Sequence, residues 1–402
     1  MAELFLQNID IKKVRNIENF IIPLSAVEKK HLIITGKNGS GKTSLLNSIN
    51  RYLSTLAERK DFSSRVVLLK EYDQLMNKES LTENEETRLH FLNEKSPLFG
   101  GVRLNFNVNN ELLRKYVDEL SYVMTFFTAR REVKMNIPVG INKISFDRKP
   151  STTSILGNSF LQYIVNMKAD RSFAKDDGER AAVQSIDRWF EKFENFLKSI
   201  FDDSGLQLKF NRKSYNFDLL ASDGSLFNFN TLSDGYASII SIISELVMRM
   251  EASNNKAYDA YGIVLIDEVE THLHVDLQKK VLPFLTSFFP NIQFVVSTHS
   301  PFVLSSISNV IICDLESKTI TSDLSKYSYD ALIESYFNTD KYSAEVKNVI
   351  AEYERLFLLK DRSIEDHMKF LKIEDIVDNM PDFRSDEIQV KIQQIRMANL
   401  GQ

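Results

Sequence analysis

Glycine and cysteine are both scarce in this chain. Of its 402 residues, 13 are glycine and one, Cys313, is cysteine. A single cysteine can form neither an intrachain disulfide nor a cysteine metal site, and this scarcity agrees with a reducing compartment. Glycine makes up about 3 per cent of the chain, compared with about 7 per cent in an average protein. The few places where glycines gather are therefore informative.

Long apolar runs are absent as well. No stretch reaches the roughly 18 apolar residues that a membrane helix needs, and the first residues lack the charged and apolar regions of a signal peptide. We therefore expect a cytoplasmic protein with no membrane partner. The net charge of −5 argues against a surface that is basic throughout, although a local basic groove is compatible with it.

What is present is the composition of a globular protein. Hydrophobic residues make up 43% and charged residues 26% of the chain, which excludes extensive disorder and fibrous repeats. Short apolar runs at residues 31–35, 262–266 and 292–296 predict buried strands, and helical patterns separate them. Strands that alternate with helices predict a largely parallel sheet covered by helices.

Weaker patterns extend this architecture. Alternating apolar residues predict further strands near residues 4–11, 102–108 and 122–129, and a hairpin over residues 206–219. Residues 60–95 are strongly charged, which is typical of a surface excursion that is helical or partly mobile.

The strongest motif is the segment GKNGSGKT, which follows the first buried strand and precedes a helix. Glycines let the backbone curl so that its N–H groups face a phosphate, and the helix start adds a positive end. We expect Lys42 to bridge the β- and γ-phosphates of a nucleotide and Thr43 to hold Mg²⁺. The candidate nucleotide-binding residues of this segment are Gly36, Lys37, Asn38, Gly39, Ser40, Gly41, Lys42, Thr43 and Ser44.

Two acids directly follow the apolar run of residues 263–266. Asp267 and Glu268 should lie at the carboxyl edge of the sheet, where α/β proteins bind their ligands. We predict that Asp267 holds Mg²⁺ through water and that Glu268 orients or deprotonates the attacking water. The competing interpretation, acids that cap the next helix, carries less weight beside the phosphate loop.

Three of the six histidines fall in the same region. His299, in the segment STHSP, comes just after the strand at residues 292–296, and we predict that it donates to the γ-phosphate or to its attacking water. His272 and His274 are two residues apart, and this spacing fits no familiar zinc motif. Helix-capping or interface contacts are the favoured interpretation of that pair.

A fourth segment, LSDGY, places Ser233 and Gly235 at the start of an apolar helix. A hydroxyl and a glycine at a helix N-terminus can form an anion site. Taken by itself, the segment would be an ordinary N-cap.

In this order the four segments resemble the motifs of ABC-type ATPases of the SMC/RecF/OLD class. GKNGSGKT is similar to the Walker A motif, LSDGY to the signature, VLIDE to Walker B and STHSP to the switch-histidine segment. The resemblance covers about residues 1–60 and 200–310, and it implies ATP and Mg²⁺ as cofactors. No glutamine stands clearly at the usual Q-loop position, so the implied ATP hydrolysis would be slow or serve mainly as a nucleotide switch.

The resemblance also implies how the site is completed. Ser233 and Gly235 would contact the γ-phosphate of an ATP held by the Walker A motif of another copy, so that chains associate head to tail as dimers or larger assemblies. Arg15, which precedes the Walker A strand, would lie near the nucleotide. Val269 and Val275 replace prolines that are common in the class. The acidic residues after the Walker B strand are retained, but the turn that contains them should be looser.

We accordingly predict an α/β fold with an ABC-type P-loop ATPase head, which has a mixed, largely parallel sheet with flanking helices, plus a helical insertion and a helical C-terminal tail. The head would comprise residues 1–140 and 205–330, the insertion residues 141–204, and the tail residues 331–402. The insertion lacks the sustained heptads of long SMC arms, and the tail lacks the Asp-x-Asp strand of a Toprim nuclease.

This architecture resembles the stand-alone defence ATPases of Septu systems and retrons. The resemblance implies an anti-phage role in which the chain holds a separately encoded HNH nuclease inactive until a phage signal arrives.

Two other functions stay open. A RecF-like repair ATPase would bind DNA or RNA through a basic patch, although solvated strand ends explain the same residues. A nucleotide-gated scaffold would bind ATP with little hydrolysis and dock a partner on the helix predicted over residues 342–359. The residues of the basic patch are Arg130, Arg131, Lys134, Lys209, Arg212 and Lys213.

Overall fold

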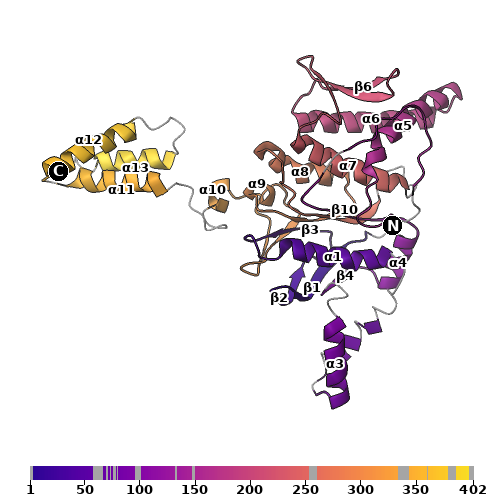
Figure 1. The fold of residues 1–402 in the computed structure, drawn as a ribbon, viewed down its shortest axis with the longest axis horizontal. Coiled ribbons are helices and arrows are strands. Elements are labelled where there is room, and N and C mark those ends of the chain that lie inside the picture. Colours follow the sequence, from indigo (N-terminus) through magenta and orange to yellow (C-terminus); the bar gives the residue numbers. More distant parts are fainter. Residues whose placement is uncertain are drawn as a thin grey trace. The chain divides into compact units, whose positions relative to one another are not determined.

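The computed structural model of the chain divides into two compact units, Met1–Tyr327 and Ser328–Gln402 (Figure 1). The residues that the structure describes are 3–57, 67–68, 71–72, 74–75, 78, 80–95, 101–131, 134–146, 150–252, 260–333, 344–359, 361–378 and 386–397.

A six-stranded sheet with the strand order β12-β11-β3-β10-β9-β5 forms the centre of the first unit. The strands from β11 to β5 run parallel, whereas β12 is antiparallel to β11. Apolar residues dominate the inner strands because both faces of the sheet are covered. The predicted mixed, largely parallel sheet is thereby confirmed. Its strands are β3 (His31–Thr35), β5 (Tyr122–Phe127), β9 (Tyr261–Ile266), β10 (Ile292–Ser297), β11 (Val310–Asp314) and β12 (Thr319–Ser322).

The carboxyl ends of three parallel strands meet at one edge of this sheet. Strand β10 lies between β3 and β9, with Val295 in register with Leu32 on one side and Leu265 on the other. A glycine turn follows β3 and leads into helix α1 (Lys42–Ala57). The segments that follow β3, β9 and β10 therefore lie side by side, although they are far apart in the sequence.

A second, antiparallel sheet in the order β2-β1-β4 lies on the other side of α1 (Figure 1). Leu45 and Leu46 of α1 share one buried core with Ile9 of β1 and Val295 of β10. The sequence pattern predicts β1 and β4 but not β2, an edge strand whose Ile21 is 56% exposed. The bounds are β1 (Leu6–Val14), β2 (Ile17–Pro23) and β4 (Val102–Phe106).

Helices α7 (Asp234–Ala252) and α8 (Val275–Phe288) cover the opposite face of the central sheet (Figure 1). Helix α7 is buried along most of its length, which explains why apolar residues occur on all its sides. The short helix α9 (Pro301–Leu304) follows β10, and Ser300 caps it by accepting from Phe302 N at 3.1 Å.

Residues 141–204 contain the paired helices α5 (Phe160–Asp176) and α6 (Arg180–Phe201). Their packing is aromatic: the ring of Trp189 stacks on Phe193 with 5.2 Å between centroids. Phe196 of α6 also contacts Phe288 of α8 at 5.2 Å, so this pair packs on the head. The single-turn helix η2 (Gly157–Ser159) precedes α5, and the predicted hairpin is confirmed as β6 (Gln207–Asn211) and β7 (Asn216–Leu220), with β8 (Leu226–Asn228) beside it.

The charged excursion predicted over residues 60–95 lies partly outside the described residues. Its described part includes the helix α3 (Glu83–Lys95), and helix α4 (Asn110–Asp118) precedes β5. Among the described residues, no helix is both long enough and apolar enough to cross a membrane.

The second unit is helical, as the sequence predicts. After α10 (Tyr329–Ala331), it contains α11 (Ala344–Leu358), α12 (Ile364–Asp378) and α13 (Asp386–Met397). Tyr353 is fully buried among these helices and stacks on Phe370 with 5.7 Å between centroids. Its hydroxyl accepts a hydrogen bond from Arg396 Nε at 3.1 Å. This unit therefore has a core of its own.

Candidate nucleotide-binding site

The turn between β3 and α1 has the backbone shape of a phosphate loop. Gly36, Gly39 and Gly41 have positive φ angles of 127°, 86° and 103°, which residues with a side chain rarely adopt. The ammonium of Lys42 folds back over the loop and donates to the carbonyl oxygens of Gly36 at 2.7 Å and Lys37 at 3.1 Å. The loop thus encloses a cationic group, as a phosphate cradle requires.

The remaining loop residues differ in their exposure. Lys37 and Asn38 are exposed, and Lys37 forms an ion pair with Glu316 at 2.8 Å. Ser44 is half-buried. The hydroxyl of Ser40 is buried and has no hydrogen-bond partner among the described residues. A phosphate oxygen would satisfy that hydroxyl, so the loop fits a nucleotide phosphate.

Lys42 lies among acidic side chains. Burial lowers the pKa of Lys42, whereas the nearby carboxylates of Glu268, Glu270 and Asp267 act in the opposite direction. The ammonium is therefore held in a partly desolvated position, where an incoming phosphate would interact with it more strongly than in water.

Thr43 and Asp267 join the first helix to the end of β9. The hydroxyl of Thr43 donates to Asp267 Oδ1 at 3.2 Å, and the same oxygen accepts from Ser297 Oγ of β10 at 2.5 Å. A hydroxyl and a carboxylate oxygen are ligands that Mg²⁺ prefers, alongside water and phosphate oxygens. Across the described residues, no group of three or more His, Cys, Asp and Glu could hold a metal by itself. The donor set therefore fits a nucleotide-bound Mg²⁺.

Glu268 is held in an unusual backbone conformation. Its φ angle is +44°, which is uncommon for a residue with a side chain and marks local strain. The Glu268 amide donates to Ser297 Oγ at 2.8 Å, and its carboxylate accepts from Thr271 Oγ1 at 3.2 Å. Ser297 of the neighbouring strand β10 thus helps to hold this backbone conformation.

His299 is positioned by Glu270, a residue that the sequence reasoning missed. The backbone amide of His299 donates to Glu270 Oε1 at 2.6 Å, and Glu270 Oε2 is buried without a hydrogen-bond partner among the described residues. Burial lowers the pKa of His299, and the nearby charge of Lys42 lowers it further, so the imidazole is neutral at pH 7. The feature of the sequence that could have identified Glu270 is its position two residues after Glu268.

Ser233 and Gly235 lie apart from this cluster. They line a cleft of about 680 Å³ together with His272 and His274. A Cβ on Gly235 would lie 2.8 Å from the carbonyl oxygen of His272, so this glycine permits a close approach of backbones. Over the described part of the chain, no hydrogen bond or ion pair connects Ser233 or Gly235 with the phosphate loop.

Arg15 is exposed in the turn between β1 and β2, with a φ angle of 51°. This turn lies against the phosphate loop: Ile17 Cδ1 is 3.3 Å from the position that a Cβ on Gly41 would take. The proximity of the turn is compatible with the predicted nucleotide contact of Arg15.

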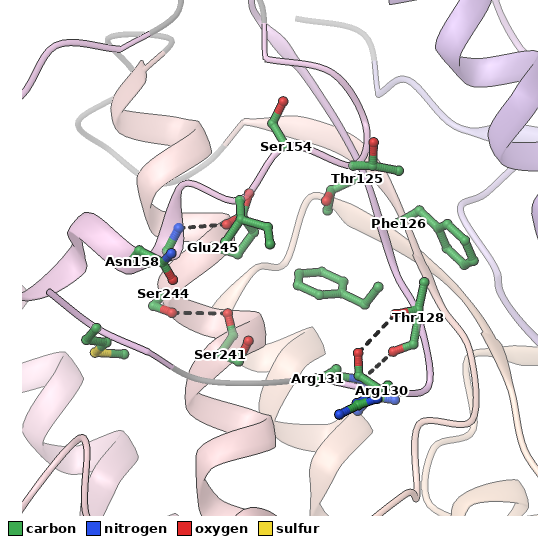
Figure 2. Close-up of a pocket in the computed structure, with 15 residues that line it drawn as sticks. Thr125, Phe126, Thr128, Arg130, Arg131, Ser154, Asn158, Ser241, Ser244 and Glu245 are labelled. Carbon is green, nitrogen blue, oxygen red and sulfur yellow. Dashed lines mark hydrogen bonds between the residues drawn. The ribbon is translucent and has the colours of Figure 1, made fainter.

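Arg131 corrects one part of the predicted basic patch. Its guanidinium points inward beside a cavity of about 170 Å³ (Figure 2), and Nη2 donates to the carbonyl oxygens of Asp267 and Glu268, both at 2.7 Å. Engaged in this way, Arg131 is not available to contact a nucleic-acid phosphate. Lys134, Lys209, Arg212 and Lys213 are exposed at the surface, as is Arg130.

Comparison with known proteins extends this description. Residues 147–305 match the family model "AAA domain, putative AbiEii toxin, Type IV TA system". The "Retron Vc95 probable ATPase" of Vibrio cholerae is 25% identical, over 88% of this chain and 84% of that protein. The "Septu protein PtuA" of Bacillus mycoides is 26% identical, over 75% of this chain but 39% of that protein. An SMC head bound to a ScpA domain covers 81% of this chain and 100% of that chain, at 14% identity and a TM-score of 0.38.

The fold, the phosphate loop and the sequence matches together are those of a P-loop ATPase. Within this class it resembles the ATPases of retron and Septu anti-phage defence.

Proposed function

We propose that two copies of the chain bind ATP and Mg²⁺ head to tail, hydrolyse the ATP, and thereby control a separately encoded nuclease of an anti-phage defence system. The observation that carries the composite site is the separation of the signature segment from the phosphate loop. Ser233 is exposed, yet no described hydrogen bond links it to that loop. A second copy would bring the two segments together across its interface.

In this proposal each group near the phosphate loop has its own task. Lys42 and the loop amides bind the β- and γ-phosphates, and Thr43 and Asp267 hold Mg²⁺, which neutralises phosphate charge when bound. Glu268 orients and deprotonates the attacking water. Neutral His299 donates to the γ-phosphate or to its attacking water, and Arg15 contacts the nucleotide at the β1–β2 turn.

The control of a nuclease is supported by the similarity to retron and Septu ATPases. We expect the partner to be an HNH nuclease encoded beside this gene. Co-expression of the two proteins should give a complex that survives size-exclusion chromatography and whose nuclease is less active than the free enzyme. Full nuclease activity in the complex would contradict this part of the proposal.

The RecF-like alternative depends on binding to nucleic acid. It is weakened by the inward position of Arg131, and its other basic residues would give a steep dependence of affinity on salt concentration. Affinity for duplex DNA measured at several salt concentrations separates the two functions, since a slope near zero excludes phosphate contacts.

Complementation between two inactive variants tests the composite site directly. Lys42→Ala removes the phosphate contact, and Ser233→Arg blocks the signature at an exposed position. Each variant alone should be inactive. In a mixture, a head-to-tail heterodimer has one site with both defects and one intact site, so random pairing should restore activity up to about one quarter of the wild-type rate, the value for independent sites. No recovery, despite heterodimer formation, would show that each site is built within one chain.

The oligomeric state provides a second test. Glu268→Gln should trap an ATP-bound dimer in size-exclusion chromatography because nucleotide binds but is not hydrolysed. Lys42→Ala should remain monomeric with ATP. Lys198→Ala is the matched control, since Lys198 pairs with Glu194 on α6, away from the loop. If ATP binding and oligomeric state are unchanged in both site variants, the proposed ATP site is wrong.

A further inference from the structure

Arg131 occupies a junction between two functional segments. Nη2 donates to the carbonyl oxygens of Asp267 and Glu268, while Nη1 donates to Ser238 Oγ at 2.9 Å. Ser238 is buried on α7, one helical turn after Asp234 of the signature segment. A single planar guanidinium thus connects the backbone of the catalytic carboxylates to the helix that directly follows Ser233.

The guanidinium is fixed in a way that lysine could not reproduce. Its Nε donates to the carbonyl oxygen of Thr128 at 3.0 Å (Figure 2). Together with the bonds of Nη1 and Nη2, this engages all three nitrogens. Burial lowers the pKa of Arg131 to about 10, and the nearby acids Glu270, Asp267 and Glu268 oppose the shift. The group therefore stays charged at neutral pH, and its hydrogen bonds are charge-assisted.

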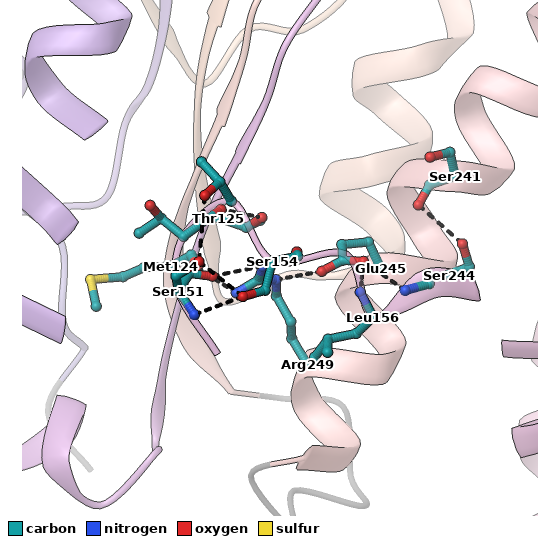
Figure 3. Close-up of polar contacts among 12 residues, drawn as sticks. Met124, Thr125, Ser151, Ser154, Leu156, Ser241, Ser244, Glu245 and Arg249 are labelled. Atoms are coloured by element: carbon teal, nitrogen blue, oxygen red, sulfur yellow. Dashed lines mark hydrogen bonds and ion pairs between the residues drawn. The ribbon is translucent and has the colours of Figure 1, made fainter. Parts of the chain in front are cut away.

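The other half of α7 is anchored separately. Arg249 and Glu245 form a buried ion pair at 2.8 Å (Figure 3). Arg249 also donates to the carbonyl oxygen of Met124 at 3.0 Å, and Glu245 accepts from the amides of Leu156 and Gly157, both at 2.7 Å. These bonds hold the middle and end of α7 to β5 and to the segment before α5.

A cavity separates the two attachments. Its volume is about 170 Å³, and it is lined by Arg131 on one side and by Ser241, Ser244 and Glu245 of α7 on the other (Figure 2). Protein interiors are otherwise close-packed, so this free volume leaves room beside the first turns of α7, whereas the Arg249 end of the helix is anchored. A movement of the first turns of α7 would reach the backbone of Asp267 and Glu268 through the hydrogen bonds of Ser238 and Arg131.

We propose that Arg131 couples the two ATP sites of the head-to-tail dimer, as a positioning residue. In the proposed dimer, Ser233 of one chain touches the ATP held by its partner, whereas Glu268 of the same chain acts on its own ATP. Arg131 links the two within one chain, so that ATP engaged at one site sets the backbone of the catalytic acids at the other. This inference rests on the composite site proposed above.

Three variants of the full-length protein test the coupling. Ser238→Ala removes only the bond to α7 and leaves both carbonyl contacts of Arg131. Arg131→Gln removes the whole junction, and Arg131→Lys restores the charge but not the planar fork. Arg171→Gln is the matched control because Arg171 donates to Asp187 within α5 and α6, away from the site.

The rate of ATP hydrolysis is measured against ATP concentration for each protein. The wild type and the Arg171 control should be cooperative, and Ser238→Ala should lower the Hill coefficient to about one with little change in kcat. Arg131→Gln should also lose cooperativity and lower kcat about tenfold without raising KM, and Arg131→Lys should recover only part of kcat. Trp189 fluorescence on heating checks that each variant is folded.

The outcomes separate the two proposals. A wild-type Hill coefficient retained in Ser238→Ala would overturn the coupling, as would a cooperative Arg131→Gln protein with a lower rate. A wild-type dimer that forms with ATP yet hydrolyses it without cooperativity would also overturn the coupling, but not the composite site. Absence of an ATP-dependent dimer in Glu268→Gln would instead overturn the composite site.

Discussion

Burial of a titratable residue in the central sheet changes its pKa, and His31 of β3 is an example. Its side chain is 5% exposed, and Nδ1 accepts a hydrogen bond from the Phe294 amide at 3.1 Å. Burial, together with the charges of Lys29 and Lys30, lowers the pKa of His31 to about 3. The folded protein therefore keeps a neutral imidazole where the unfolded chain would protonate it.

The sign of the resulting pH dependence follows directly. The unfolded chain protonates His31 near pH 6.5, so its contribution to stability is complete above that pH and falls as the pH drops toward 3. We expect a loss of about 2 kcal/mol in the free energy of unfolding between pH 7 and pH 5 from this residue. Urea unfolding of wild type and His31→Asn at both pH values measures it, because asparagine keeps an acceptor but does not titrate. Equal losses in both proteins would contradict the expectation.

The residues of the candidate site differ in how far the sequence could reveal them. The phosphate loop could be located because its residues are consecutive and its glycine conformations are local requirements. Glu270 and Arg131 could not be assigned contacts from the sequence. Glu270 meets a backbone amide 29 residues away, and Arg131 meets a carbonyl 136 residues away.

Among the elements, strand β9 is tightly enclosed near its start. A Cβ on Gly262 would lie 2.4 Å from the carbonyl oxygen of Val123 in β5 and 2.8 Å from Ile292 Cδ1 in β10. The backbone of β9 therefore approaches both neighbours more closely than any side chain permits.

A methyl group at this position should force the strands apart. We expect Gly262→Ala to lower the free energy of unfolding by about 1–3 kcal/mol. Gly140→Ala is the control, since no atom lies within 4 Å of its Cβ position, and it should stay within about 0.5 kcal/mol of wild type. Urea unfolding followed by Trp189 fluorescence compares the three proteins. A Gly262→Ala protein as stable as the control would mean that β5 relaxes without cost.

The strands that the sequence predicted are those with a continuous apolar or clearly alternating pattern. Strands β3, β9 and β10 are buried on both faces, and so their sequences are mostly apolar. Strands β2 and β12 lie at sheet edges with exposed residues, which leaves a weaker pattern. Strand β11 is a short apolar run, which periodicity alone cannot distinguish from part of a helix.

At the scale of the whole molecule, the two units can be followed by separate probes. The single tryptophan, Trp189, lies in the first unit, whereas Tyr353 is at the centre of the helices of the second. Tryptophan fluorescence therefore reports on the first unit alone, and far-ultraviolet circular dichroism reports on both.

Truncation of Tyr353 should affect one unit only. Tyr353→Ala removes a fully buried ring, its stacking on Phe370 and its hydrogen bond with Arg396, and we expect a loss of about 3–5 kcal/mol in the second unit. Circular dichroism should show early loss of helix on heating, with an unchanged Trp189 transition. Tyr327→Ala, at a side chain that is 58% exposed, should change neither signal. A shift of the Trp189 transition in Tyr353→Ala would show that the units unfold together.

The sequence by itself determined the phosphate loop, the acidic strand end, and the order of the main strands and helices. These depend on local backbone geometry and on the periodicity of burial, both of which are written in consecutive residues. Only the tertiary structure decided that Thr43 meets Asp267, that Glu270 holds the His299 segment, and that Arg131 turns inward to helix α7. Parallel strands bring together segments that are remote in the chain, and the hydrogen bonds between them exist only after the sheet has formed.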